Sequence, residues 1–150
     1  MEYFDEINSA KSLFLLNIEE PQDNQVIITI QETTLSGAEE YVKIGDKAIG
    51  PLRAIISDEG CRKFNLLFRS YIAYTVMNES FPLWHEYEEW TGKLLRVYSK
   101  SNYLDYIRKD TSAKEYFDYV NEKLKHFSIN CENHVIHVVT IEQPIINEIS

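Results

Sequence analysis

The residues best suited to chemistry lie near the C-terminus: Cys131, His134 and His137, with His126 just before them. Thiolate and imidazole groups are typical zinc ligands, and zinc needs three or four of them converging on one point. A β-hairpin turn at 132–133 would place Cys131 opposite His134. His137 lies an odd number of residues further on, so it should point to the other face of its strand. One face then offers two ligands. A third would have to come from elsewhere, from Cys61, His85 or His126. We therefore predict no metal site.

The pair Cys131 and His134 is also the best candidate for a nucleophile, because a neighbouring histidine can lower the pKa of a thiol. Its neighbours are apolar and strand-forming, however, and no third group is placed to orient the histidine. The chain has no Gly-x-Ser-x-Gly motif and no glycine-rich phosphate loop, and it contains only five glycines. We expect a buried thiol packed beside a histidine, and we predict neither an enzyme nor a cofactor.

Carboxylates cluster between the two tryptophans of the chain. On a strand, Glu86 and Glu88 would share a face with both tryptophans. Paired carboxylates act in acid–base catalysis when they line a concave, partly dry site, and a single strand does not provide one. Tryptophan and tyrosine are enriched at the centres of protein interfaces, and carboxylates around them favour a basic partner. The predicted partner-binding residues are Trp84, Glu86, Tyr87, Glu88, Glu89 and Trp90. The alternative is that the tryptophans pack beneath helices while the glutamates extend into solvent.

A three-stranded antiparallel meander over residues 64–98 is expected to position these side chains. Its strands would be Phe64–Met77, Trp84–Trp90 and, after a turn at Thr91-Gly92, Lys93–Tyr98. Apolar residues at the even positions of Phe64–Met77 predict a face packed on the core. Fourteen residues is long for one strand, so we expect a bend or bulge near Arg69-Ser70. The odd-numbered face would extend the partner-binding surface through Arg69, Tyr71 and Met77.

Two hairpins flank the meander: Leu13–Ile18 with Val26–Ile30, and Phe127–Cys131 with His134–Ile141. A short strand at Arg53–Ser57 and an edge contact from residues 145–149 complete the predicted sheet. The Ser-x-x-Glu spacing at Ser36 and Glu39 predicts a helical turn, and the glycines and proline of residues 44–51 predict a loop.

Two late helices, near 101–109 and 113–125, show apolar stripes that should cover one face of the sheet. Their tyrosines should pack between helix and sheet: Tyr103, Tyr106, Tyr116 and Tyr119. The predicted fold class is α+β. It comprises a single domain with about seven or eight mostly antiparallel strands, curled into a half-open barrel or sandwich.

Composition restricts the classes of function. The chain has 150 residues, 44% hydrophobic and 13% aromatic, which is typical of a globular domain. No apolar run approaches the roughly 20 residues that span a bilayer, and the N-terminus is acidic where a signal peptide is basic. Two cysteines make no disulfide framework. We therefore expect a cytoplasmic protein without a membrane contact.

The net charge of −9 also bears on the partner. Residues 1–92 carry all of this excess, while residues 93–125 carry +3 and residues 126–150 carry −3. Such a chain should be repelled by nucleic acid. Its charge would speed encounter with a basic protein, and the alternative is that it serves solubility alone. The leading hypothesis is an acidic protein-binding domain, such as an immunity protein or inhibitor that neutralises a basic toxin. The alternatives are a small-molecule-binding or enzymatic β-domain with a site near Cys131 and His134, and a plain homo-oligomer subunit such as a homodimer.

Overall fold

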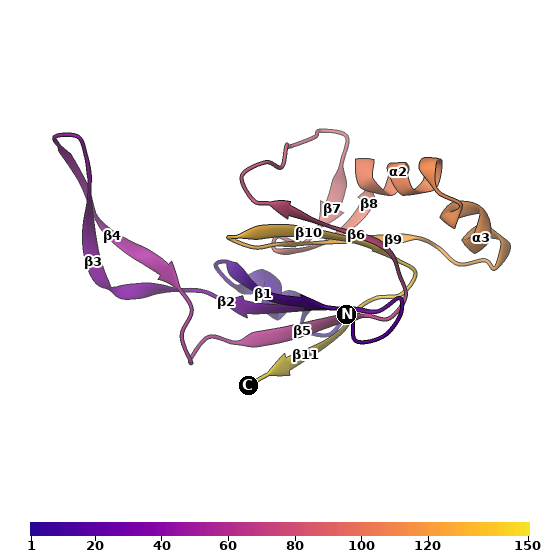
Figure 1. Ribbon diagram of the computed structural model, residues 1–150, viewed down its shortest axis with the longest axis horizontal. Helices are drawn as coiled ribbons and strands as arrows, with labels where there is room; N and C mark the ends of the chain where they lie inside the picture. Colours follow the sequence, from indigo (N-terminus) through magenta and orange to yellow (C-terminus); the bar gives the residue numbers. More distant parts are fainter.

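The computed structural model describes residues 1–150 and contains eleven β-strands and three short helices (Figure 1). The strands are β1 (Leu13–Glu19), β2 (Val26–Glu32), β3 (Thr34–Ile44), β4 (Lys47–Ile56), β5 (Lys63–Phe68), β6 (Tyr71–Asn78), β7 (Glu89–Thr91), β8 (Leu95–Lys100), β9 (Lys125–Asn130), β10 (His134–Thr140) and β11 (Ile145–Ile149). The helices are α1 (Phe4–Ser9), α2 (Asn102–Asp110) and α3 (Ala113–Tyr119). The predicted α+β class is confirmed.

Two antiparallel sheets form the body of the molecule, and neither closes into a barrel. The four-stranded sheet has the order β1-β2-β5-β11, and the five-stranded sheet has the order β6-β10-β9-β8-β7. Their inner faces meet through alternating apolar residues, as the period-two pattern of β5 predicts. The rings of Phe68 on β5 and Phe127 on β9 pack across the layers with centroids 5.7 Å apart.

The predicted long strand Phe64–Met77 divides at Arg69-Ser70, where a bend was expected. The segment before the break, β5, belongs to the four-stranded sheet, and β6 after it belongs to the five-stranded sheet. Because the chain crosses between layers here, the alternation does not continue through the break. Tyr71 packs against the core, and Arg69 pairs with Glu142, so the predicted odd-numbered face through Met77 is not one surface.

The predicted meander is confirmed only in its last pairing, between β7 and β8; its first strand does not pair with its second. Strand β6 pairs with β10, and residues 79–88 form a loop in place of a strand. Pro82, two residues before the predicted strand, lacks an N–H and cannot contribute to a ladder, which disfavours strand pairing at the start of this segment. Only Glu89–Thr91 is extended; it pairs with β8 across a turn that includes Gly92.

The predicted terminal hairpins are confirmed. Strand β1 pairs with β2, and β9 pairs with β10 across the turn at 132–133. The Cys131 N–H donates to the His134 carbonyl at 2.8 Å, so these residues face each other as predicted. Strand β11 lies beside β5, which confirms the edge contact predicted for residues 145–149. Helix α1 was not predicted.

Helices α2 and α3 lie on the outer side of the five-stranded sheet (Figure 1). Leu104, Ile107 and Ala113 pack there with Val139 of β10. Of the four tyrosines predicted to pack between helix and sheet, only Tyr103 does so. The other three are between 53% and 90% exposed. Helix α3 ends at Tyr119, before the predicted 125, and it extends past the edge of the sheet, so its tyrosines face solvent. No helix is both long enough and apolar enough to cross a bilayer.

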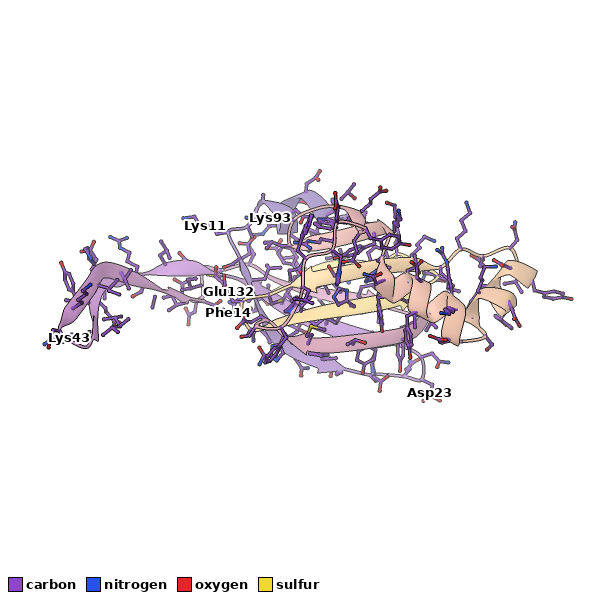
Figure 2. The ribbon with its side chains drawn as sticks, turned by 90° about the horizontal axis from the view of Figure 1, so that it is seen from above. Lys11, Phe14, Asp23, Lys43, Lys93 and Glu132 are labelled. Atoms are coloured by element: carbon purple, nitrogen blue, oxygen red, sulfur yellow. The ribbon has the colours of Figure 1, made fainter.

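Strands β3 and β4 form a hairpin that projects far from the body, and we call residues 34–56 the arm (Figures 1 and 2). The helical turn predicted at Ser36–Glu39 and the loop predicted at 44–51 are both wrong. Ser36 Oγ instead accepts a hydrogen bond from the Ala38 amide. Gly45, with a φ of 62°, and Asp46 form the two-residue turn. A single helical turn at this position would bury no apolar side chain. In the hairpin, hydrogen bonds between β3 and β4 satisfy most backbone groups on the facing sides of the two strands.

Phe127→Ala should lower the free energy of unfolding by about 3–5 kcal/mol, because it removes a ring that is 1% exposed and joins the two sheets. Urea denaturation measures this loss. Tyr119→Ala is the control, because its 90% exposed side chain should change stability by less than about 0.5 kcal/mol. Equal effects of the two substitutions would contradict the sandwich core.

Candidate functional site

The segment between β6 and β7, residues 79–88, is the candidate functional site, and we call it the tryptophan loop. Its second half is fixed to helix α2. The Asn102 amide donates to Glu88 Oε2 at 3.1 Å, and the Tyr87 hydroxyl donates to Asp105. Lys100 Nζ also lies 4.3 Å from the centroid of the Tyr87 ring. These contacts hold one end of the loop against the body.

The first half of the tryptophan loop exposes apolar side chains. Phe81 is 71% exposed, Leu83 77% and Trp84 76%, with the exposed Pro82 among them. The base of this half is fixed by a turn, since the Phe81 amide donates to the Asn78 carbonyl at 3.2 Å. Four consecutive apolar residues therefore face solvent on a segment that is anchored at both ends.

The six predicted partner-binding residues do not share a strand face. Trp84 and Glu86 are exposed on the loop, whereas Tyr87 and Glu88 anchor it. The others flank or line the body: Glu89 begins β7, and half-buried Trp90 packs on Tyr98 with their ring centroids 5.6 Å apart. The Arg96 guanidinium lies 4.4 Å from the centroid of the Trp90 ring. The loop thus separates the two tryptophans into an exposed one and a packed one.

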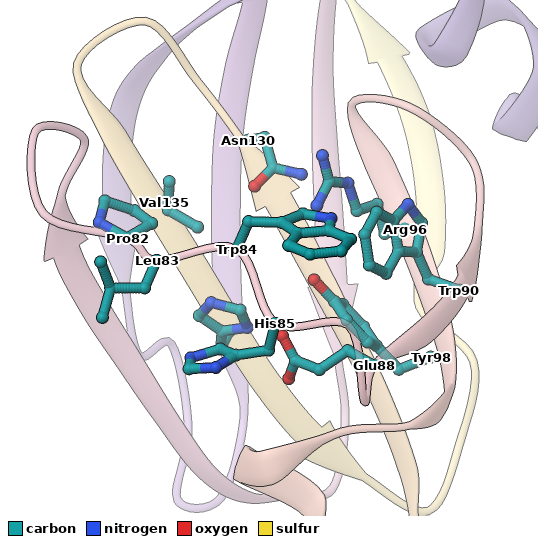
Figure 3. Close-up of a pocket in the computed structure, with 11 residues that line it drawn as sticks. Pro82, Leu83, Trp84, His85, Glu88, Trp90, Arg96, Tyr98, Asn130 and Val135 are labelled. Carbon is teal, nitrogen blue, oxygen red and sulfur yellow. The ribbon is translucent and has the colours of Figure 1, made fainter.

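A cavity of about 300 Å³ lies between the tryptophan loop and the outer face of the five-stranded sheet (Figure 3). Trp84 and Glu88 line it from the loop, and Arg96, Tyr98 and His137 line it from the sheet. In Figure 3 the Trp84 indole extends over this space towards the Tyr98 hydroxyl. Aromatic faces and charges of both signs meet here.

Behind this cavity, Ser101, His126 and His137 form a hydrogen-bonded relay. Ser101 Oγ lies 2.6 Å from His126 Nδ1, and His126 Nε2 lies 2.9 Å from His137 Nδ1. The Tyr98 ring stacks on the His126 ring with their centroids 4.2 Å apart. His126 is 1% exposed and Ser101 is fully buried, so their polar atoms need partners within the protein.

The bonding pattern assigns the protons of this relay. Ser101 Oγ accepts from the Leu104 amide at 3.1 Å, and His126 Nδ1 is the one acceptor within hydrogen-bonding distance of this buried hydroxyl, so the tautomer that satisfies both groups has Ser101 donating to His126 Nδ1. A neutral His126 then carries its proton on Nε2 and donates to His137 Nδ1. His137 in turn carries its proton on Nε2, the nitrogen with no partner in the protein. A residue that lines the cavity is thereby held as a hydrogen-bond donor.

Both histidines are held neutral. Burial lowers the pKa of His126 to about 3, and its neighbour His137 adds to this effect. Burial also lowers the pKa of His137 to about 4, with a further contribution from the positive charge of Arg96. Imidazoles with such pKa values are poor proton acceptors at neutral pH, so the relay is suited to orienting side chains.

Cys131 lies in the core cluster, and burial raises the pKa of its thiol to about 12. A thiol protonated at neutral pH is a poor nucleophile. His134 is half-buried, and its Nδ1 has no hydrogen-bond partner. His137 lies on the opposite face of β10, as predicted, and it meets His126 there. No group of three or more His, Cys, Asp or Glu side chains is arranged to hold a metal ion.

Two features of the site escaped the sequence prediction although signals for them were present. The apolar run Phe81–Trp84 contains a proline, which disfavours a central strand and indicates a loop. The relay follows from the register of the final hairpin, in which His137 is opposite Ser128 and therefore diagonal to His126.

Comparisons of this chain with protein-family models, with curated proteins and with solved structures gave no match.

The neutral histidine pair should make stability depend on pH. An unfolded chain binds a proton on each histidine near pH 6.5, whereas folded His126 and His137 bind theirs near about 3 and about 4. Because the folded pKa values are depressed, stability is retained above pH 6.5 and lost as the pH falls below it. The loss should approach about 1.4 kcal/mol per pH unit for each histidine.

Urea unfolding at about pH 7.5, 6 and 5 measures this slope. His137→Gln retains only one of the two neutral imidazoles and should show a distinctly shallower slope than the wild type. Equal slopes for the two proteins would contradict a neutral His126–His137 pair.

Iodoacetamide at about pH 8 should label the native chain once, at Cys61, and leave Cys131 unmodified. Cys61 is half-buried, whereas the buried Cys131 thiol is protonated at that pH. Mass spectrometry of the native and urea-unfolded protein measures the labels, with two expected after unfolding. The Cys61→Ser control should remain unlabelled in its native state. Rapid labelling of that variant would show that Cys131 is reactive and would support its role as a nucleophile.

Proposed function

We propose that the chain is a cytoplasmic protein-binding domain that captures a basic partner through the tryptophan loop. The observation that carries this proposal is the exposure of Phe81, Leu83 and Trp84 on a loop anchored at both ends. Monomeric proteins seldom expose contiguous large apolar side chains without a binding role. Tryptophan is also among the residues that contribute most to interface energies.

The charge of the loop supports a basic partner. Residues 79–88 contain three glutamates and no lysine or arginine, within a chain of net charge −9. Glu79 and Glu86 are exposed on either side of the apolar segment, whereas Glu88 is engaged with helix α2. An acidic rim around an apolar centre accelerates encounter with a cationic protein and disfavours acidic competitors. An inhibitor or immunity protein that neutralises a basic toxin would use such a surface. Two free cysteines are consistent with a cytoplasmic setting.

A small-molecule ligand is the second candidate, and the cavity beneath the loop favours it over the neighbourhood of Cys131. That cavity brings together Arg96, Tyr98 and the Nε2–H of His137, a set that suits a ligand with hydrogen-bond acceptors. The two candidate functions require different contact residues. A small molecule would contact the cavity lining alone, whereas a protein partner would also contact Phe81 and Glu79 outside the cavity.

Tagged protein should capture a basic protein from cells of its source, and two loop variants should lose it. Leu83→Ser with Trp84→Ala removes the apolar centre, and we expect a dissociation constant raised at least about 30-fold. Glu79→Lys with Glu86→Lys reverses the rim charge and should slow association about tenfold or more at low salt.

The matched control is Tyr116→Ser with Tyr119→Ala, which removes two exposed aromatic side chains from helix α3. This control should capture the same partner as the wild type, with affinities measured by surface plasmon resonance. Identical partners and affinities for all four proteins would exclude the tryptophan loop as the binding surface.

A further inference from the structure

We propose that the arm is a dimerisation element, and that two copies of this chain associate by pairing arm to arm about a twofold axis. The arm is separate from the tryptophan loop: it leaves the four-stranded sheet, whereas the loop lies over the five-stranded sheet (Figure 1). Figure 2 places Lys43 near its far end, well away from the body.

The first observation is apolar exposure along the whole arm. Every residue of β4 is exposed, and so is nearly every residue of β3. Eight large apolar side chains of the arm are between 37% and 66% exposed: Leu35, Tyr41, Val42, Ile44, Ile49, Leu52, Ile55 and Ile56. None belongs to either core cluster. An isolated two-stranded hairpin is at best marginally stable in water, so an arm of this length requires something to cover it.

The second observation is the pairing within the arm. Val42 lies opposite Ile49, and Ile44 lies opposite Lys47, which puts Val42, Ile44 and Ile49 on one face near the tip. The register shifts between Glu40 and Val42, so the apolar face of the distal part need not continue that of the base. The outer edges of both strands also remain unpaired in the two-stranded sheet. An unpaired edge of this length is a template for a further strand.

The charge of the arm favours a second copy over a strongly acidic or basic partner. The arm carries three acidic and three basic residues and is neutral, whereas the rest of the chain carries all of the net −9. Two of these charges already form an ion pair within the arm, with Arg53 Nη2 3.6 Å from Glu39 Oε1. A basic or acidic partner therefore gains no net attraction from the arm. A second arm brings an equal apolar surface and no repulsion, and it keeps the two acidic bodies apart.

A twofold axis brings the same edge and the same face of each arm together, so one surface of the arm forms both sides of the interface. Pairing the distal parts of two arms edge to edge would give a four-stranded antiparallel sheet there and satisfy the open backbone groups along that part of one edge in each copy. The apolar tip residues of the two arms would then adjoin one another on one face.

The test is the oligomeric state of the full chain. Sedimentation equilibrium over micromolar to submillimolar concentrations should show a monomer–dimer equilibrium for the wild type. The triple variant Val42→Glu, Ile44→Glu, Ile49→Lys places each new charge opposite an opposite charge across the hairpin, so the arm keeps its own pairing. Loss of three apolar contacts per copy should weaken the dimer at least about 100-fold.

The control is Tyr119→Glu, which makes the same change in net charge at the most exposed tyrosine of helix α3 and should dimerise like the wild type. A wild type that is monomeric at the highest concentration overturns the proposal, as does a triple variant that dimerises unchanged.

Mixing tagged wild type with the untagged triple variant distinguishes arm-to-arm pairing from an arm that clasps the other body. Arm-to-arm pairing predicts almost no mixed dimer, because one arm of each mixed pair is altered. A clasped body predicts mixed dimers, because the body of the variant is intact, and their recovery on the tag overturns arm-to-arm pairing.

Discussion

The hydrogen bond of 2.6 Å between Ser101 Oγ and His126 Nδ1 links the sheet, the helix and the candidate site. Ser101 is also the N-cap of α2, where its oxygen accepts from the Leu104 amide. The first turn of that helix then holds Glu88 and Tyr87 of the tryptophan loop. A buried polar residue on β9 thus requires a partner, and the partner begins the helix that anchors the loop. The position of Trp84 therefore depends on an imidazole that does not touch it.

The outer face of the five-stranded sheet is polar at the cavity, where Arg96 and His137 line it, and apolar where α2 covers Val139. His126 and His137 lie where the Tyr98 and Tyr103 rings cover them, and both are neutral because burial disfavours their charged forms. Further along β10, Val139 packs under α2 with no polar group to satisfy. We therefore expect a binding site on the part of the outer face that the helices leave uncovered, since the inner face of the sheet packs in the core.

Sequence reasoning predicted the elements whose pattern reflects burial. The hairpin at 132–133 and the opposition of Cys131 and His134 followed from alternation and turn length. The bend expected near Arg69-Ser70 followed from the length of the run, although the change of sheet at that point was not predicted. Only the strand at Arg53–Ser57 was predicted within the arm, which β4 contains up to Ile56. The rest of the hairpin was not predicted, because both of its faces meet solvent and its sequence carries no inward–outward alternation. The tryptophan loop was not predicted because aromatic and acidic residues suit an exposed strand as well as a loop.

The two proposed surfaces differ in a way that makes them compatible. The arm is neutral and extends from one end of the four-stranded sheet, whereas the loop is acidic and covers the five-stranded sheet. Pairing through the arms therefore leaves both tryptophan loops of a dimer open. Two loops carried on one dimer would bind a partner with repeated sites at raised effective concentration, although each loop alone binds more weakly. Because paired arms would hold the acidic bodies apart, this gain would not require the two like-charged surfaces to approach each other.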